Sequence, residues 1–314
     1  MHNNEQKQIL VIGSYNVGFT CHTSRMPVWG ETLLGSGFSV SDGGKGANQA
    51  VAAARLGGKV SFLGKVGDDD YGKAGVLMLQ REGVCTDDVL YTDAAKTGVG
   101  FVFLNEHGEN CIIVDPGANH LLSPDDLKKS SIEEADIVVF QLENRVETIE
   151  QGMRLGKELG KTVILNPAPA KPELDHLLQL ATIVTPNESE LLILSGLDPS
   201  RSLSSEECRD LALALLQKGP EAVIVTRGEN GALLVTKDGQ TAQFAAPKVD
   251  VVDTTGAGDS FTGALSVAIS EGKSLQEAVQ FACSVGAFCV TKKDVIPALP
   301  TRSELTSFIA TLQR

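Results

Sequence analysis

The sequence predicts an α/β fold with a mostly parallel central sheet, helices on both faces of that sheet, and a small inserted β-sheet lid. Three observations support it. Apolar runs of strand length alternate with segments of helical periodicity over the first two thirds of the chain, the final third is mostly helical, and two strand-like segments interrupt the alternation without a helix nearby. With 314 residues and 42% hydrophobic residues, the chain can bury a large core, and we expect one domain over residues 1–314.

The first strand of the body is expected at 8–13 (QILVIG), where apolar residues run without interruption. Further buried strands are expected at 60–63, 137–140, 163–165, 183–185 and 223–226. Helical patterns are expected between and after them, at 47–56, 73–82, 146–159, 206–217, 258–270, 275–290 and 302–312.

The two segments that interrupt the alternation are 31–41 (ETLLGSGFSVS) and 97–114, and both indicate short strands. Residues 106–110 lie between apolar runs of the second segment and predict a hairpin turn. We therefore expect the lid to be formed by insertions at about 15–42 and 96–118. An exposed sheet of this kind calls for a covering partner, and a homodimer through the lids is one way to supply it.

The composition excludes several classes of partner. A net charge of −13 argues against nucleic acid and against an anionic membrane surface, while a local cradle for a small phosphorylated ligand stays possible. The polar start of the chain lacks the apolar run of a signal peptide, and no apolar stretch is long enough to span a membrane. The cysteines lack metal-site or C-x-x-C spacing and predict reduced, mostly buried thiols in a cytoplasmic enzyme. They are Cys21, Cys85, Cys111, Cys208, Cys283 and Cys289.

The run 252–263 (VDTTGAGDSFTG) carries the clearest chemical signal. Gly256, Ala257 and Gly258 precede an apolar helical pattern and would offer unblocked backbone N–H groups at a helix N-terminus, where an anion is favoured. Asp259 would face that anion. Charge stabilisation beside a base is what phosphoryl transfer to a hydroxyl requires, whereas a glycine-rich N-cap is the structural alternative.

A second glycine-rich element, 42–49 (DGGKGANQ), leads into the helical pattern VAAARLG. Its glycines would let the backbone approach a ligand closely, and Lys45 and Asn48 supply hydrogen-bonding side chains. Taken alone, this element also fits a tight turn that starts a helix.

Other catalytic motifs are weak or missing. Residues 67–74 fit the start of a P-loop motif, G-x-x-x-x-G-K, but the next residue is Ala74. A P-loop needs a Ser or Thr hydroxyl there as a magnesium ligand. A solvated loop that caps the next helix is therefore the better interpretation. The first strand lacks a Rossmann G-x-G-x-x-G, and no hydrolase G-x-S-x-G elbow is evident. The histidines form no metal or triad pattern. They are His2, His22, His107, His120 and His176.

The segment 185–190 (TPNESE) follows an apolar strand and starts a helix. Asn187 and Glu190 are three residues apart and so share a helical face. One interpretation is a capping box, with Asn187 as N-cap. The other is a site near the phosphates that holds a hydrated Mg²⁺ indirectly.

Together these residues resemble the ribokinase family, which includes phosphofructokinase type B and adenosine kinase, and the resemblance runs almost from end to end. It rests on 43–57 (GGKGANQAVAAARLG) and 253–264 (DTTGAGDSFTGA), with smaller motifs between them at 97–110, 116–119 (PGAN), 141–143 (QLE), 166–170 (NPAPA) and 185–190. The ribokinase branch is the most similar. The resemblance implies a ribokinase-like fold and ATP-dependent phosphorylation of the primary hydroxyl of a sugar, with ribose as the default.

It also implies roles for named residues. Asp259 would be the base, and the amides of Gly256, Ala257 and Gly258 would hold the transferring charge. The residues implied for the sugar pocket are Asn16, Gly18, Gly44, Lys45, Gly46, Ala47, Asn48, Glu143 and Asp259. Those implied for ATP are Asn187, Thr226, Arg227, Gly228, Glu229, Asn230, Gly231, Gly258 and Cys283, with Mg²⁺ as cofactor. An activating K⁺ is implied at Asp253, Thr255, Cys289, Lys292, Asp294 and Ala298.

Three positions depart from the family pattern. Gly18 stands where family members usually have an Asp that hydrogen-bonds to two ring hydroxyls of the sugar. Loss of that carboxylate would cost ~2–4 kcal/mol of binding free energy for the sugar. Asp294 and Ala298 replace a usual Gly and Ser beside the potassium ligands, and Cys283 replaces a His or Asn near adenine. The alternatives left open are a kinase of another sugar, such as deoxyribose or fructose, a nucleoside kinase, and a non-catalytic sensor that kept the fold.

Overall fold

The computed structural model describes residues 7–105 and 110–312. The predicted hairpin turn at 106–110 lies largely outside these residues, as do the polar start of the chain, His2 and His107. Within the described part of the chain, no helix combines the length and the apolar character needed to cross a bilayer.

A nine-stranded sheet forms the body, in the order β13-β12-β11-β10-β9-β8-β1-β4-β5. Its strands are β1 (Gln8–Ile12), β4 (Lys59–Gly67), β5 (Cys85–Thr92), β8 (Ile137–Phe140), β9 (Thr162–Leu165), β10 (Ile183–Val184), β11 (Ala222–Thr226), β12 (Ala232–Thr236) and β13 (Thr241–Phe244). Every pairing from β5 to β11 is parallel, and β12 and β13 add antiparallel strands at one edge. The predicted α/β class is confirmed.

The helices cover both faces of this sheet. They are α1 (Lys45–Arg55), α2 (Asp70–Arg81), α3 (Lys129–Glu134), α4 (Val146–Glu158), α5 (Glu188–Leu194), α6 (Ser205–Leu216), α7 (Ala257–Ser270), α8 (Leu275–Cys289) and α9 (Arg302–Leu312). Short 3-10 segments are η1 (Gly117–Leu121), η2 (Pro124–Asp126), η3 (Pro172–Leu180), η4 (Gly228–Asn230) and η5 (Ile296–Ala298). Alternate residues of β1 enter separate cores: Ile9 and Val11 pack with α1, α7 and α8, while Leu10 and Ile12 pack with α4 and α6.

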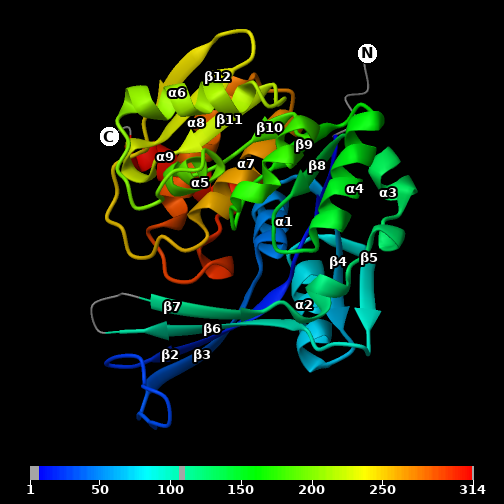
Figure 1. The fold of residues 1–314 in the computed structure, drawn as a ribbon, viewed down its shortest axis with the longest axis vertical. Coiled ribbons are helices and arrows are strands. Elements are labelled where there is room, and N and C mark those ends of the chain that lie inside the picture. Colours follow the sequence, from blue (N-terminus) through cyan, green and yellow to red (C-terminus); the bar gives the residue numbers. More distant parts are fainter. Residues whose placement is uncertain (1–6, 106–109, 313–314) are drawn as a thin grey trace.

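A separate four-stranded sheet, called here the small sheet, has the order β3-β2-β6-β7. It consists of β2 (Asn16–His22), β3 (Ser36–Gly43), β6 (Gly98–Leu104) and β7 (Asn110–Asp115). Figure 1 shows these strands projecting from the body, below most of the helices in that view. The strands fall within the two predicted insertions, although the expected strand at 31–41 begins only at Ser36.

Candidate functional site

A cavity of about 860 Å³ opens at the carboxyl ends of the parallel strands, where α/β sheets generally bind ligands. It brings together residues that lie far apart in the sequence. Lys45 comes from α1, Asn187 follows β10, Thr226 ends β11, and Asp259 and Cys283 come from α7 and α8. Two residues predicted for the sugar, Lys45 and Asp259, therefore line one cavity with residues predicted for ATP.

The N-terminus of α7 is shaped by Gly256, which caps the helix in the left-handed region at φ 75°. A side chain there would also collide with Val295, since an added Cβ lies 2.4 Å from its Cγ1. The Ala257 amide donates to the Thr254 carbonyl at 3.2 Å, so this one of the three expected anion donors is already engaged in a turn. An added Cβ at Gly258 meets nothing within 4 Å, which leaves room for a ligand to approach the backbone there.

Asp259 lies in the first turn of α7, with only 5% of its surface exposed. Its Oδ2 accepts a hydrogen bond from Asn48 Nδ2 at 2.8 Å, and its Oδ1 accepts one from Gln49 Nε2 at 2.9 Å. Both amides are on α1, so this helix and α7 build the carboxylate's surroundings together. Within the described part of the chain, the Asn48 Oδ1 is buried without a partner, which makes it an acceptor available to a ligand hydroxyl.

Two lysines, Lys45 and Lys248, line the cavity. The Asp259 carboxylate is the main cause of a raised Lys45 pKa, and Glu143 and Glu190 add to it against the opposing effect of burial. The Lys45 backbone N–H donates to Glu143 Oε2 at 3.0 Å, and Ser14 Oγ donates to the same oxygen at 2.5 Å. Glu143 thus anchors the start of α1.

The glycines before α1 are required by backbone packing. Gly44 has φ 91°, and an added Cβ would lie 2.7 Å from the Asn16 nitrogen. At Gly46 the same atom would lie 2.6 Å from the Ser14 nitrogen. We expected these glycines to let the backbone approach a ligand. In the structure they let the start of α1 pack closely against the chain that leaves β1, and buried Ala47 follows them.

Asn16 and Gly18 lie on the same face of β2 because side chains alternate along a strand. Asn16 Oδ1 accepts a hydrogen bond from Asn119 Nδ2 at 2.8 Å, and Asn119 also bonds both backbone groups of Tyr15. Gly18 pairs with Ser41 on one side and Gly100 on the other. None of the small-sheet residues lines the 860 Å³ cavity.

On the other side of the cavity, Asn187 and Glu190 form the capping box that the spacing predicted. Asn187 Oδ1 accepts from the Glu190 amide at 2.8 Å, and Glu190 Oε2 accepts from the Asn187 amide at 2.8 Å. Burial raises the pKa of the Glu190 carboxyl to about 7. Both side chains also line the cavity, so the capping geometry leaves them within it.

The turn after β11 supplies most of the residues predicted for the nucleotide. Thr226 and residues 228–231 line the cavity. Arg227 does not, because its guanidinium donates to Glu188 Oε1 at 2.9 Å and to Ser205 Oγ at 2.8 Å, which ties the turn to α5 and α6. Cys283 lines the cavity as a buried thiol, and burial raises its pKa to about 12.

The residues predicted for potassium lie beside the N-terminus of α7. Asp253 accepts from the Thr255 amide at 2.9 Å and from the Asp294 amide at 3.2 Å, which joins the two segments. Asp294 has φ 67°, the conformation that a glycine would adopt there. The remaining members adopt compact turns: the Lys292 amide donates to the Cys289 carbonyl at 3.2 Å, and Ala298 is buried in η5.

The P-loop-like segment 67–74 is a helix cap. Asp69 is the N-cap of α2 and accepts from the Gly72 amide at 2.9 Å. It also accepts from the amide and the hydroxyl of Thr97, at 2.9 and 2.7 Å. The predicted helix cap is therefore present, and Asp69 also joins the start of α2 to Thr97, the residue before β6 of the small sheet.

Sequence reasoning gave no individual role to Gln49, Gln141, Asn166 and Asn119. All four are buried and hydrogen-bonded at the site. They lie within the motifs 43–57, 116–119, 141–143 and 166–170, and position gave a further signal, because Gln141 and Asn166 directly follow the predicted strands 137–140 and 163–165. Amide side chains there face the edge where ligands bind.

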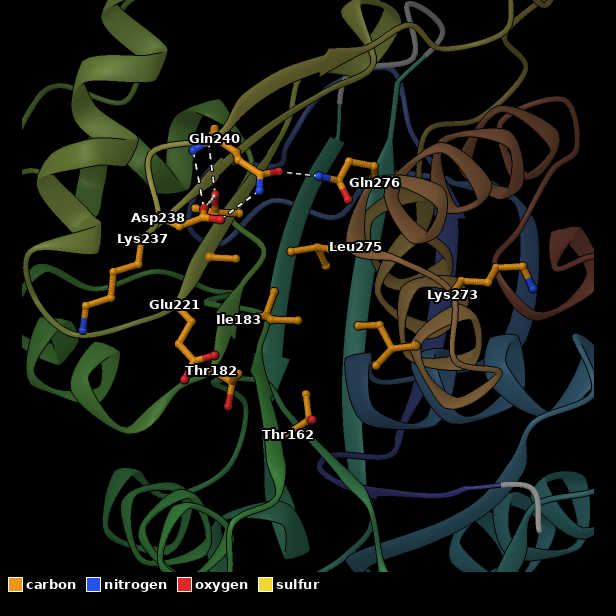
Figure 2. A pocket seen from close by; sticks show the side chains of 13 residues that line it. Thr162, Thr182, Ile183, Glu221, Lys237, Asp238, Gln240, Lys273, Leu275 and Gln276 are labelled. Atoms are coloured by element: carbon orange, nitrogen blue, oxygen red, sulfur yellow. Dashed lines mark hydrogen bonds between the residues drawn. The ribbon is translucent and has the colours of Figure 1, made fainter. Parts of the chain in front are cut away.

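A second depression, of about 790 Å³, lies at the opposite edge of the sheet, at the amino ends of β9, β10 and β11. Figure 2 shows that several of its polar side chains bond to one another. Gln240 Nε2 donates to Asp238 Oδ2 at 2.8 Å, and Gln276 Nε2 donates to Gln240 Oε1 at 2.6 Å. The candidate site is therefore assigned to the cavity around Asp259.

Comparisons with known proteins identify the family of this chain. The family described as pfkB family carbohydrate kinase matches residues 6–302. A ribokinase of Haemophilus influenzae is 37% identical over 306 residues, covering 97% of this chain and 99% of the relative. A deoxyribokinase of Salmonella typhi is also 37% identical, covering 96% and 98%. The solved structure of Arabidopsis thaliana ribokinase complexed with ribose and ATP has a TM-score of 0.88 at 32% identity, covering 97% of this chain and 99% of that one.

Proposed function

Because the chain belongs to the pfkB family of carbohydrate kinases, we propose that it transfers the γ-phosphoryl group of ATP to the primary hydroxyl of a pentose, with D-ribose as acceptor and ribose 5-phosphate as product. The observation that carries this proposal is the buried Asp259 carboxylate in the first turn of α7, beside a backbone with room for an anion at Gly258. The relatives named for ribose support the acceptor.

In this mechanism Asp259 accepts the proton of the sugar hydroxyl as that oxygen attacks the γ-phosphorus. The amides at the start of α7, with the helix dipole, stabilise charge on the transferring group. The Lys45 ammonium, whose charged form Asp259 stabilises, is placed to offset charge between the two substrates. Asn48 and Glu143 orient the sugar, and the turn at 226–231 with Cys283 holds the nucleotide.

Mg²⁺ bound to ATP would lower the charge of the phosphates. Asn187 and Glu190 would hold its water shell, because both line the cavity and a carboxyl with a pKa of about 7 ionises readily near a cation. Asp253 and neighbouring carbonyl groups would hold an activating K⁺, a hard cation that oxygen donors suit. Replacing K⁺ by Na⁺ in the assay, with Mg²⁺ constant, tests this and should lower kcat.

The test of the whole proposal is an ATP-consumption assay with pentoses, hexoses and nucleosides, each with Mg²⁺ present. We expect the highest kcat/KM with ribose, and phosphate on its primary hydroxyl by ³¹P NMR. No acceptor-dependent ATP consumption with any of them would contradict the proposal.

Two glycines at the centre of the small sheet, Gly18 and Gly100, favour a second candidate, a kinase of another sugar or of a nucleoside. Ser41, Gly18, Gly100 and Val114 form one register row across its four strands, on the face that carries Asn16. An added Cβ at Gly100 meets nothing within 4 Å, and one at Gly18 approaches closely only the Ser41 hydroxyl. This face therefore offers space in place of a carboxylate, which suits an acceptor with fewer hydroxyls, such as deoxyribose, or with a larger substituent.

The other face of the small sheet supports a homodimer. Val40, Phe19, Phe101 and Ile113 form the adjacent row, and Val40, Phe101 and Ile113 are 50%, 42% and 59% exposed. Phe38, 68% exposed, stacks on Phe19. A second copy presenting the same apolar face would cover this surface, with the small sheet closing over the sugar as a lid.

We place the enzyme in the cytoplasm, since all six cysteines are free thiols.

A further inference from the structure

Gln49 connects the Asp259 carboxylate to a longer chain of buried amides. Its Nε2 donates to Asp259 Oδ1 at 2.9 Å, and its Oε1 accepts from Gln141 Nε2 at 2.7 Å. Gln49 is fully buried and Gln141 is 1% exposed. Amides withdrawn from water this completely need partners, and for Gln49 one partner is the proposed base, whereas the Gln141 Oε1 is buried without a partner in the described part of the chain.

Asn166 attaches this chain to the sheet. Gln49 Nε2 also donates to Asn166 Oδ1 at 3.0 Å, and Asn166 Nδ2 donates to the Thr185 carbonyl at 3.0 Å. Gln141, Asn166 and Thr185 are the residues directly after β8, β9 and β10. The amide chain therefore ties a carboxylate on α7 to the carboxyl ends of three adjacent strands.

The direction of these hydrogen bonds is fixed at both ends. An ionised carboxylate and a backbone carbonyl only accept, so Asn166 must turn its NH₂ to Thr185 and its oxygen to Gln49. Gln49 must then turn its NH₂ to Asp259 and its oxygen to Gln141. One hydrogen-bonded path, from Gln141 Nε2 to Gln49 Oε1 and from Gln49 Nε2 to Asp259 Oδ1, therefore runs toward the carboxylate, while Gln49 Nε2 also donates to Asn166.

We propose that Gln49 is a positioning residue for the proton transfer, which holds the Asp259 carboxylate in one orientation, with Gln141 supporting it from behind. The inference rests on the proposed function, because it takes Asp259 as the base. Gln49 acts through Asp259 and makes no contact with substrate.

The test compares Gln49→Met with the wild type under steady-state conditions. We expect kcat to fall about 10- to 100-fold, with KM for sugar and for ATP changed less than about threefold, since an interaction that acts at the transition state is lost. If Gln49→Met does not fold, Gln49→Leu carries the same test, as it also offers Asp259 no donor.

Gln141→Met keeps the bond from Gln49 to Asp259 and should lower kcat by less. The matched control is Thr148→Val on α4, which removes an equally buried hydrogen bond, from Thr148 Oγ1 to the Leu122 carbonyl at 2.7 Å, away from the site. This control should lower the thermal midpoint and leave kcat unchanged. A Gln49 variant that behaves like the control would overturn the positioning role.

A double-mutant cycle separates this inference from the proposed function. In an Asp259→Asn background, Gln49→Met should cost no further activity, because its effect passes through the missing carboxylate. Independent, additive losses would overturn the inference. If Asp259→Asn alone retains wild-type turnover, the proposed function fails, whereas an inactive Asp259→Asn beside a fully active Gln49→Met rejects only the role of Gln49.

Discussion

Gly18 is the residue at which the identity of the acceptor can be tested most simply. Its backbone φ lies outside the left-handed region, and an added Cβ closely approaches only the Ser41 hydroxyl, at 2.9 Å, which can rotate away. Gly18→Asp should therefore fold and place a carboxylate on the face that carries Asn16. We expect KM for ribose to fall about 10-fold or more at nearly constant kcat, since hydrogen bonds to a charged group are worth about 1.5–3 kcal/mol.

Gly18→Asn is the matched control for that substitution, because it has the same shape without the charge, and it should give a smaller gain. An unchanged KM for every pentose with Gly18→Asp would show that this face does not contact the acceptor.

Glu190 gives the molecule a pH dependence whose sign follows from its environment. Burial raises its folded-state pKa to about 7 from an ordinary value of 4.5, so the folded state prefers the protonated form. The stability that this preference contributes is present below about pH 4.5 and is lost as pH rises through 7. We expect the free energy of unfolding to fall by about 1–2 kcal/mol more in the wild type than in Glu190→Gln between pH 5 and pH 8, after a discount for solvent screening.

Urea denaturation of both proteins without nucleotide measures this difference, and Gln preserves the acceptor for the Asn187 amide. Identical pH dependence in the two proteins would show that Glu190 ionises as it does in the unfolded chain.

Single residues were predictable where the pattern was local. The spacing of Asn187 and Glu190 sufficed for the capping box, and the composition of 253–264 indicated a glycine-capped helix that begins near Asp259. The amide chain behind Asp259 was not predictable, because Gln49 and Gln141 lie 92 residues apart and meet only through the sheet order. Nor could composition show that the Arg227 guanidinium pairs with Glu188.

The contact between α1 and α7 is the element-scale feature on which the site depends. Gly263 on α7 allows it, since an added Cβ would lie 2.7 Å from both Ala52 Cβ and the Gln49 carbonyl oxygen of α1. We expect Gly263→Ala to lower the free energy of unfolding by about 1–3 kcal/mol through overpacking, and to lower kcat by shifting Asn48 and Gln49 away from Asp259.

Gly286→Ala on α8 is the control for stability, because its added Cβ meets only the Ala257 carbonyl oxygen at an ordinary 3.8 Å. It should be neutral or stabilising by about 0.5–1 kcal/mol, as expected for glycine replaced within a helix. Equal stability of the two variants in chemical denaturation would contradict the close packing of α1 and α7.

Elements were predicted well where apolar periodicity was strong. The expected strand 137–140 coincides with β8, and the expected helix 302–312 coincides with α9. The sequence analysis missed β5, β12 and β13, three strands at the two edges of the large sheet. Edge strands have a neighbour on one side only, so β5 and β13 consist mostly of exposed and partly buried residues and lack the apolar runs of central strands.

At the scale of the whole molecule, the exposed apolar face of the small sheet predicts self-association. Phe101→Glu places a charge in the row of Val40, Phe19 and Ile113, and we expect it to convert a dimer into a monomer at micromolar concentration. Light scattering with size-exclusion chromatography measures the mass. Leu213→Glu on α6, 36% exposed before substitution, is the control and should remain dimeric. A monomeric wild type would contradict the proposed dimer.

The most direct test of the central claim, that Asp259 is the base beside the phosphoryl site, is the turnover of Asp259→Asn with ribose and MgATP, alongside its nucleotide affinity by calorimetry. Asparagine keeps the shape and removes the proton acceptor. We expect kcat to fall by about 10²–10⁴-fold with nucleotide affinity changed less than about threefold. Turnover within tenfold of the wild type would contradict the account.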